Sequence, residues 1–311
     1  VEVTDGDGNK ETKTISLTID EAVEDESGLI IIASTFSATD DETSDSGDDS
    51  QTFTNTSSTQ TGIATLVDNS ASNDNLVTVT LPPGVSVTSE GSADAQSSEE
   101  AQESLTESIQ QLNSETETTD DLIENVNNFI NQLPNSTQVD VRTIVPTTTS
   151  TDLEQPILFT GSSGSSTGDD QTEAFIIDLS NLPSGTEIQL DNIDFAVIIG
   201  SVEITGGSGS NVVYADDSAQ IIVLGEDDDT LHGGGGNDTI GSAGGRDLLI
   251  GDDGHDNVHG GRGHDTLRGQ TGRDTLTGGR GRDHLSAGRG ADILKGQRNN
   301  DRLQGKHGRD T

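Results

Sequence analysis

Residues 260–268 read Gly-Gly-Arg-Gly-His-Asp-Thr-Leu-Arg, and variants of this nonapeptide fill the chain from residue 224 to residue 311. A large aliphatic residue stands two positions after each aspartate except Asp310, as Leu267 follows Asp265, and a glycine usually stands two positions before the aspartate. Self-similarity at a fixed period is typical of stacked repeats, in which no single repeat can bury its apolar face alone. The period therefore predicts a solenoid. The aspartates that recur at every ninth residue are Asp229, Asp238, Asp247, Asp256, Asp265, Asp274, Asp283, Asp292, Asp301 and Asp310.

Each nonapeptide divides into a turn and a short strand. The glycine-rich half suits a turn, because glycine reaches backbone conformations that are closed to other residues. The other half has one apolar residue flanked by polar ones, which predicts a strand with its central side chain inward. Two nonapeptides then make one coil, and equivalent turns stack about 4.8 Å apart. Stacking should place Asp247, Asp265 and Asp283 in one column and Asp256, Asp274 and Asp292 in the other.

Two columns of carboxylates repel each other unless a cation lies between them. A hard divalent cation with six or more oxygen ligands, some of them backbone carbonyls, fits such a gap, and calcium fits best. The turn glycines leave their carbonyl oxygens accessible, so we expect them to share these sites with the ten aspartates. The candidate glycines are Gly233, Gly234, Gly236, Gly251, Gly254, Gly260, Gly263, Gly269, Gly272, Gly278 and Gly281.

Residues 233–241 and 260–268 resemble the G-G-x-G-x-D-x-U-x nonapeptide of RTX calcium-binding proteins, in which the aspartate is position six. The resemblance covers residues 224–311. It implies a right-handed parallel β-roll, calcium ions between successive coils, and export by a type I secretion machine. It also implies a secreted, extracellular or cell-surface location in a Gram-negative bacterium.

Departures from the pattern predict weaker calcium sites in two places. Residues 197–223 keep the register but carry Asn211 and Gln220 at position six. We expect them to form capping coils that hold calcium poorly. Asn299 replaces the glycine before Asp301, and asparagine tolerates left-handed geometry best after glycine. We therefore expect weaker sites around residues 296–301.

Charge divides the chain in two. The formal net charge is −41. Residues 224–311 carry 15 acidic residues against 10 Arg and 2 Lys, a net of −3, which leaves −38 for residues 1–223. So acidic a chain disfavours nucleic acid and anionic membrane surfaces as partners. All six histidines lie in the repeats; we expect solvated polar residues, with a transition-metal site as the alternative.

Composition limits the rest of the chain. Apolar residues make up 28% and aromatic residues 2% of the sequence, too few for a large core, and cysteine is absent. The longest apolar run, residues 29–33, cannot span a membrane. The chain starts without methionine and stops in mid-repeat, so we expect a fragment of a larger protein.

Four segments precede the repeats. Residues 1–22 resemble the last hairpin of a bacterial Ig-like or cadherin-like domain, with a strand over 12–19. Residues 23–60 are acidic and predict a linker. Residues 61–196 predict a small α+β module with one helix after a Ser97–Glu100 capping box and a second after Thr119. Its strands are expected at 76–81, 138–145, 174–179 and 186–190, with a further strand at 195–204. The fold class is thus mostly β.

One catalytic motif is present, and it does not predict an enzyme. Residues 164–168 match G-x-S-x-G, but they lie in a Ser/Gly run, and no histidine occurs outside the repeats to serve as base. We therefore expect a calcium-binding, non-catalytic part of an adhesin-like protein with a cell-surface or matrix ligand. The alternative is the tail of a secreted hydrolase or pore-forming toxin whose active domain lies upstream.

Overall fold

The computed structural model describes residues 2–4, 10–12, 48–55, 57, 59–69, 74–92, 95–112, 117–161 and 171–311. The expected strand over residues 12–19, most of the expected linker and the G-x-S-x-G motif lie outside the described residues. Near the N-terminus, β1 (Glu2–Thr4) pairs antiparallel with β2 (Lys10–Thr12), in line with the hairpin expected in residues 1–22.

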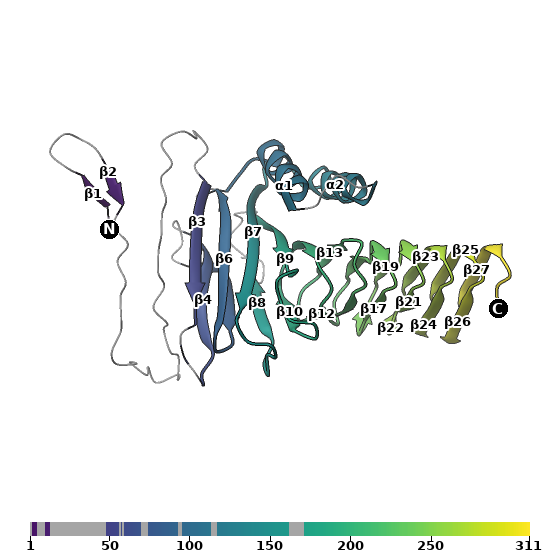
Figure 1. Cartoon of the computed structure of the whole chain (residues 1–311). Helices are drawn as coiled ribbons and strands as arrows, with labels where there is room; N and C mark the ends of the chain where they lie inside the picture. Colours follow the sequence, from purple (N-terminus) through teal and green to yellow (C-terminus); the bar gives the residue numbers. More distant parts are fainter. Residues whose placement is uncertain are drawn as a thin grey trace.

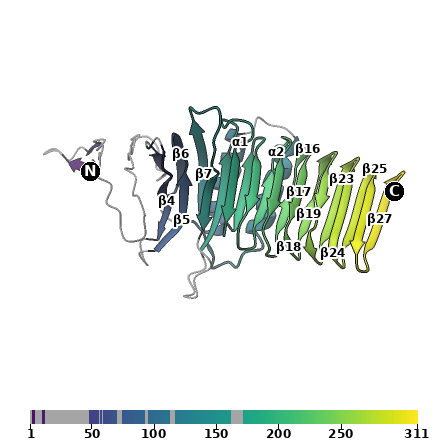
Figure 2. The same cartoon turned by 90° about the horizontal axis from the view of Figure 1, so that it is seen from below.

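From residue 48 onward the chain forms two long sheets that face each other across one core (Figures 1 and 2). The twelve-stranded sheet contains β4 (Gly62–Asn69), β5 (Asp74–Leu81), β8 (Ile157–Gly161), β10 (Glu187–Asp191), β12 (Glu203–Gly206), β14 (Ile221–Leu224), β17 (Thr239–Ser242), β18 (Gly244–Gly245), β21 (Asn257–His259), β22 (Arg262–Gly263), β24 (Thr275–Gly281) and β26 (Ile293–Arg298). The thirteen-stranded sheet contains β3 (Asp48–Thr54), β6 (Val85–Ser92), β7 (Gln138–Thr148), β9 (Gln171–Asp178), β11 (Phe195–Ile199), β13 (Val212–Ala215), β15 (Thr230–His232), β16 (Gly235–Gly236), β19 (Leu248–Ile250), β20 (Asp253–Gly254), β23 (Thr266–Gly272), β25 (His284–Gly290) and β27 (Arg302–Gly308).

The repeats form a parallel β-solenoid of about eight turns over residues 174–308, as the nine-residue period predicts. Each residue of a repeat strand pairs with the residue 18 positions later, so two nonapeptides make one coil. In one sheet Leu249 pairs with Leu267, which pairs with Leu285. In the other, Val258 pairs with Leu276. All five side chains are fully buried, and they stack as two ladders in the space between the sheets.

The coils begin earlier than the sequence predicts. We expected the solenoid to start at residue 197, but β7 already pairs parallel with β9, and β8 with β10. The apolar ladder therefore runs back through Ile204 and Ile188 to Ile157. These earlier coils lack the nine-residue phase because their turns differ in length, so a search for the period misses them. The expected single strand at 195–204 is two strands, β11 and β12, which lie in opposite sheets.

Antiparallel strands close the N-terminal end of the solenoid. Strand β3 pairs with β6 and β6 with β7, while β4 pairs with β5 and β5 with β8. Strand β3 lies inside the segment expected to be a linker, so that expectation is wrong for residues 48–54. Its Ser and Thr side chains suggested disorder, yet they pair across the sheet: Thr52 contacts Thr88 at 3.1 Å between the hydroxyl oxygens.

Two helices cover the outer face of the thirteen-stranded sheet near β7 to β13 (Figure 1). Helix α1 (Ser98–Leu112) begins at the predicted capping box, in which the Ser97 N–H donates to Glu100 Oε2 at 3.0 Å. Helix α2 (Glu117–Ile130) begins two residues before Thr119, earlier than expected. The helices pack their apolar faces on that sheet, with Phe129 stacked on Phe195 at 4.2 Å between ring centroids. Within the described residues, no helix has the length and apolar character needed to cross a membrane.

Candidate functional site

The ten predicted aspartates form two columns, one on each edge of the solenoid where the turns stack. In every case the Oδ1 atom accepts the backbone N–H of the residue 18 positions earlier. For example, the Asp247 N–H donates to Asp265 Oδ1 at 3.1 Å, and the Asp265 N–H donates to Asp283 Oδ1 at 3.1 Å. All the bonds of this kind lie between 2.9 and 3.2 Å. The columns are those that the sequence predicts.

In seven of the ten aspartates the second carboxylate oxygen is buried and has no hydrogen-bond partner. A buried, unpartnered carboxylate oxygen is costly, because it has lost water and gained no donor in exchange. Such an oxygen is available to bind a cation. The unpartnered oxygens are the Oδ2 atoms of Asp238, Asp247, Asp256, Asp265, Asp274, Asp283 and Asp292.

Backbone carbonyl oxygens border the same spaces. A Cβ atom built on Gly260 would lie 2.7 Å from Asp265 Oδ2 and 2.7 Å from the carbonyl oxygen of Gly278, one coil further on. The first glycine of the repeat thus leaves room where a carboxylate and a carbonyl approach each other. Gly233 has the same surroundings, with Asp238 Oδ2 and the Gly251 carbonyl both at 2.8 Å.

The other predicted glycines shape the turn. Gly263, at position four, has φ +149°, and a Cβ there would overlap the carbonyl oxygen of Gly245. Asn299 occupies position four with φ +83°, the left-handed backbone expected of it. At position four lie Gly236, Gly254, Gly263, Gly272 and Gly281; at position one lie Gly233, Gly251, Gly260, Gly269 and Gly278; Gly234 is at position two. The prediction omitted Gly245, Gly290, Gly296, Gly305 and Gly308, which occupy equivalent places in the same phase.

The carboxylates have perturbed acidity. Burial is the largest cause and raises the pKa of Asp265 from 3.8 to about 7. The N–H of Asp247 lowers this pKa, whereas the negative charges of Asp247 and Asp283 raise it further. Burial likewise raises the pKa of Asp256 to about 7. Desolvation thus opposes ionisation more than repulsion within the column does.

The donor set is composed of oxygen. No group of three or more His, Asp or Glu side chains converges among the described residues, so an ion would depend largely on backbone carbonyls. Carboxylate and carbonyl oxygens without nitrogen or sulfur ligands suit a hard cation, and several carbonyls in an adaptable turn suit calcium better than magnesium. The residues present therefore fit calcium.

The coils before residue 224 replace the carboxylate with an amide. Asn211 and Gln220 occupy the column positions, and their N–H groups donate to Asp229 and Asp238. The Asn211 Nδ2 also donates to the Ile193 carbonyl oxygen at 2.7 Å. An amide donor here satisfies a carbonyl without a cation, consistent with the expected weak calcium binding of these coils.

A second ladder, which the sequence did not predict, runs along position five. The backbone N–H of Arg282 donates to His264 Nδ1 at 2.9 Å, and the backbone N–H of Arg273 donates to His255 Nδ1 at 2.9 Å. The Oδ1 atom of Asn237 accepts the backbone N–H of His255 in the same way. His255 and His264 are exposed, as expected of solvated polar residues, and they also accept backbone hydrogen bonds between coils.

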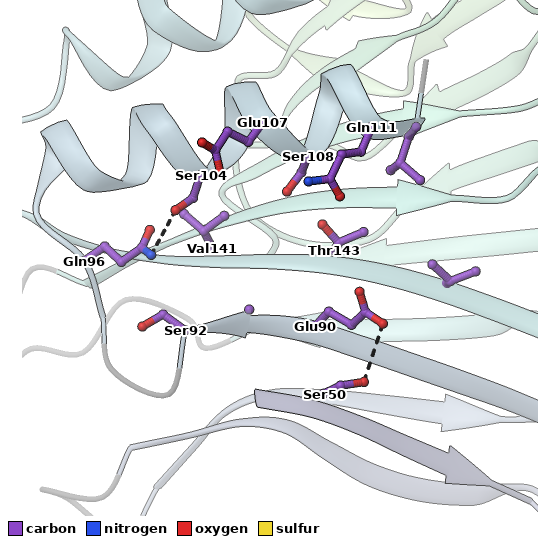
Figure 3. A pocket seen from close by; sticks show the side chains of 13 residues that line it. Ser50, Glu90, Ser92, Gln96, Ser104, Glu107, Ser108, Gln111, Val141 and Thr143 are labelled. Atoms are coloured by element: carbon purple, nitrogen blue, oxygen red, sulfur yellow. Dashed lines mark hydrogen bonds between the residues drawn. The ribbon is translucent and has the colours of Figure 1, made fainter. Parts of the chain in front are cut away.

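A separate hollow of about 390 Å³ lies between α1 and the thirteen-stranded sheet (Figure 3). Its lining is mostly Ser, Gln and Glu side chains, with hydrogen bonds from Gln96 to Ser104 at 3.0 Å and from Ser50 to Glu90 at 3.5 Å. Among the residues that the structure describes, no His, Lys or Arg lines it. The ionisable side chains in the lining are the carboxylates of Glu90 and Glu107.

Comparison with known proteins identifies the repeats. The model of the RTX calcium-binding nonapeptide repeat matches residues 203–231, 214–249, 242–267, 250–285, 268–303 and 277–311. No curated protein and no solved structure matches the chain. With its stacked coils, paired carboxylate columns and phased glycines, the segment from residue 203 to residue 311 is an array of RTX calcium-binding nonapeptide repeats.

Proposed function

We propose that this chain is the calcium-dependent folding and secretion module of a large extracellular or surface-attached bacterial protein, adhesin-like and without catalysis of its own. The observation that carries the proposal is the set of buried Oδ2 atoms without a partner. Without a cation, each ionised carboxylate opposes the fold. Calcium would supply the missing positive charge, so that binding and folding are linked.

The calcium concentrations at which such sites fill match the difference in calcium between the cytosol and the outside of the cell. Sites in extracellular modules bind calcium with dissociation constants of about 0.1–1 mM. Cytosolic calcium would then leave the repeats unfolded and suited to export by a type I secretion machine, whereas external calcium would fold them. The β1–β2 hairpin supports an adhesin-like context, because tandem Ig-like domains end in such hairpins. The outer face of a Gram-negative cell is the proposed location.

The test is far-ultraviolet circular dichroism of the whole chain, 1–311, in excess EDTA and in millimolar calcium. We expect a gain of β signal with calcium, together with protection of residues 203–311 from proteolysis. Magnesium is the ionic control, since it requires near-octahedral geometry and gives up water reluctantly. Asp253→Asn is the matched variant control: Asp253 is exposed in the same repeats but lies outside the columns, so its calcium response should be unchanged. A β signal already complete in EDTA would refute the proposal.

A further inference from the structure

Arginines stack directly above one another on one edge of the solenoid. Arg262 pairs with Arg280, and Arg280 pairs with Arg298, in the parallel register of β22, β24 and β26. All three occupy position three of their repeats. Adjacent strands lie about 4.7–4.9 Å apart, so the three side chains leave the backbone at a regular spacing along the edge.

Two more arginines lie on the same edge. Arg246 and Arg282 occupy position five of this set of turns, next to Asp247 and Asp283. We call the set of Arg246, Arg262, Arg280, Arg282 and Arg298 the arginine edge. All five residues are exposed.

The arginine edge is poorly neutralised by the protein. Arg262 approaches Glu226 at 3.9 Å between Nη1 and Oε1, with both side chains mostly in solvent. For Arg280, Arg282 and Arg298 there is no ion pair within the described part of the chain. Like charges placed directly opposite each other on neighbouring strands are destabilising, so this arrangement works against the fold.

The fold does not require arginine at these places. Position three is Gly244 in the preceding coil of this edge and Thr271 on the opposite edge, and both pair in register. At position five, His264 accepts the Arg282 N–H, but a guanidinium has no acceptor to offer to the next coil. Arginine at position five therefore cannot accept the backbone N–H of the next coil, as histidine does.

We propose that the arginine edge binds a linear anionic polysaccharide with carboxylate or sulfate groups. Guanidinium groups bind such oxyanions in a bidentate manner, and they lose less hydration than ammonium groups in doing so. A sugar ring in an extended chain is comparable in length to the strand spacing, so successive anionic groups can meet successive coils. The proposal deepens the proposed function by naming the ligand class of the adhesin-like module, and it rests on calcium folding the coils.

The same edge is less suited to single-stranded nucleic acid. Proteins that bind single strands combine a cationic groove with aromatic side chains on which bases stack. No Phe, Tyr or Trp follows Tyr214 in the chain, so the arginine edge has no stacking platform.

Calcium and the polysaccharide should help each other. The column of Asp265 and Asp283 lies on this edge, and bound calcium would offset its negative charge. Because coupling between two binding sites is reciprocal, polysaccharide should also tighten calcium binding.

The test is fluorescence anisotropy of a labelled heparin oligosaccharide with the whole chain in millimolar calcium. The edge variant changes Arg262, Arg280 and Arg298 to Gln. The matched control changes Arg273, Arg289 and Arg309, on the opposite edge, to Gln and alters the net charge equally. We expect the edge variant to bind roughly tenfold more weakly, about twofold per arginine, and the control to lose less than about threefold. The affinity of the edge variant should also depend less on salt.

The outcomes separate the possible failures. Circular dichroism of each variant in calcium shows whether the coils fold, so a failure of calcium-driven folding is distinguished from a failure of polysaccharide binding. Neutral dextran should not bind. Equal losses in the two triple variants, or no binding by the folded parent, would overturn the proposal. Tighter binding of single-stranded DNA of matched charge would also overturn it.

Discussion

Replacing Asp265 with asparagine should change the stability of the repeats in opposite directions with and without calcium. The variant keeps an Oδ1 atom that can accept the Asp247 N–H. It loses the negative charge and exchanges the unpartnered Oδ2 for an amide donor. Asn211 occupies the equivalent place upstream, and its amide donates to a carbonyl oxygen at 2.7 Å. The column can therefore accommodate the new side chain.

The pKa of Asp265 sets the size of the effect without calcium. Its pKa is raised from 3.8 to about 7, and each unit corresponds to about 1.36 kcal/mol. After allowance for screening by solvent near the turn, we expect the variant to stabilise the metal-free coils by about 1–4 kcal/mol near pH 8. With calcium at 100 times the dissociation constant, loss of one site should cost about 2.7 kcal/mol.

Two titrations measure these effects on chain 1–311. In EDTA, trimethylamine N-oxide favours burial of protein surface and should fold the variant at a lower concentration than the parent. In calcium, urea should unfold the variant at a lower concentration. Asp265→Ala is the control: it also removes the acceptor for the Asp247 N–H and should be less stable than the Asn variant in both conditions. A loss of stability for Asp265→Asn in EDTA would refute the account of the unpartnered oxygen.

Three further predictions concern packing, pH and charge. Leu267→Ala removes a fully buried side chain and should lower the free energy of unfolding in calcium by about 2–5 kcal/mol. Leu303 is half-exposed, so Leu303→Ala is the control. Equal losses of stability in urea denaturation would contradict the burial of Leu267 between the sheets. In EDTA, the β signal should grow as pH falls from about 8 to about 5. Carboxyl groups with a folded pKa near 7 and an unfolded pKa near 3.8 stabilise the coils at low pH and lose that contribution as pH rises through 7. A β signal that does not change with pH would count against the raised pKa values. Arg282→Asn should tighten calcium binding in calorimetry at low salt, less so at high salt, since it removes a cation next to Asp283; an unchanged low-salt affinity would show that this arginine does not affect the site.

The phase of the sequence predicted the solenoid and its columns because each coil repeats the same two chemical requirements. An aspartate must meet the N–H of the coil before it, and an aliphatic residue must fill the space between the sheets. Asp265 and Leu267 meet both, so a fixed spacing of nine residues suffices to place them. The position-five ladder was missed because Asn237, His255 and Arg273 share no residue type.

The N-terminal half was harder to predict because its coils share only the apolar ladder. Ile157, Ile188 and Ile204 stack in register, but the chain between them forms turns of different lengths. Strand β3 carries few apolar residues and owes its place to pairing with β6. Local composition contains no information about such a partner.

The carboxylate bonds give the array a direction. Each aspartate side chain accepts the N–H of the coil before it, whereas backbone bonds such as that from the Thr266 N–H to the Asp247 carbonyl oxygen run the other way. Removing coils from the C-terminal side would leave inner N–H groups without an acceptor. Removing them from the N-terminal side would expose carboxylate oxygens and would also leave backbone N–H groups, such as that of Thr266, without their carbonyl acceptors. Loss of a coil at either end therefore leaves N–H groups unpaired, but only loss at the C-terminal end deprives an aspartate N–H of its carboxylate acceptor.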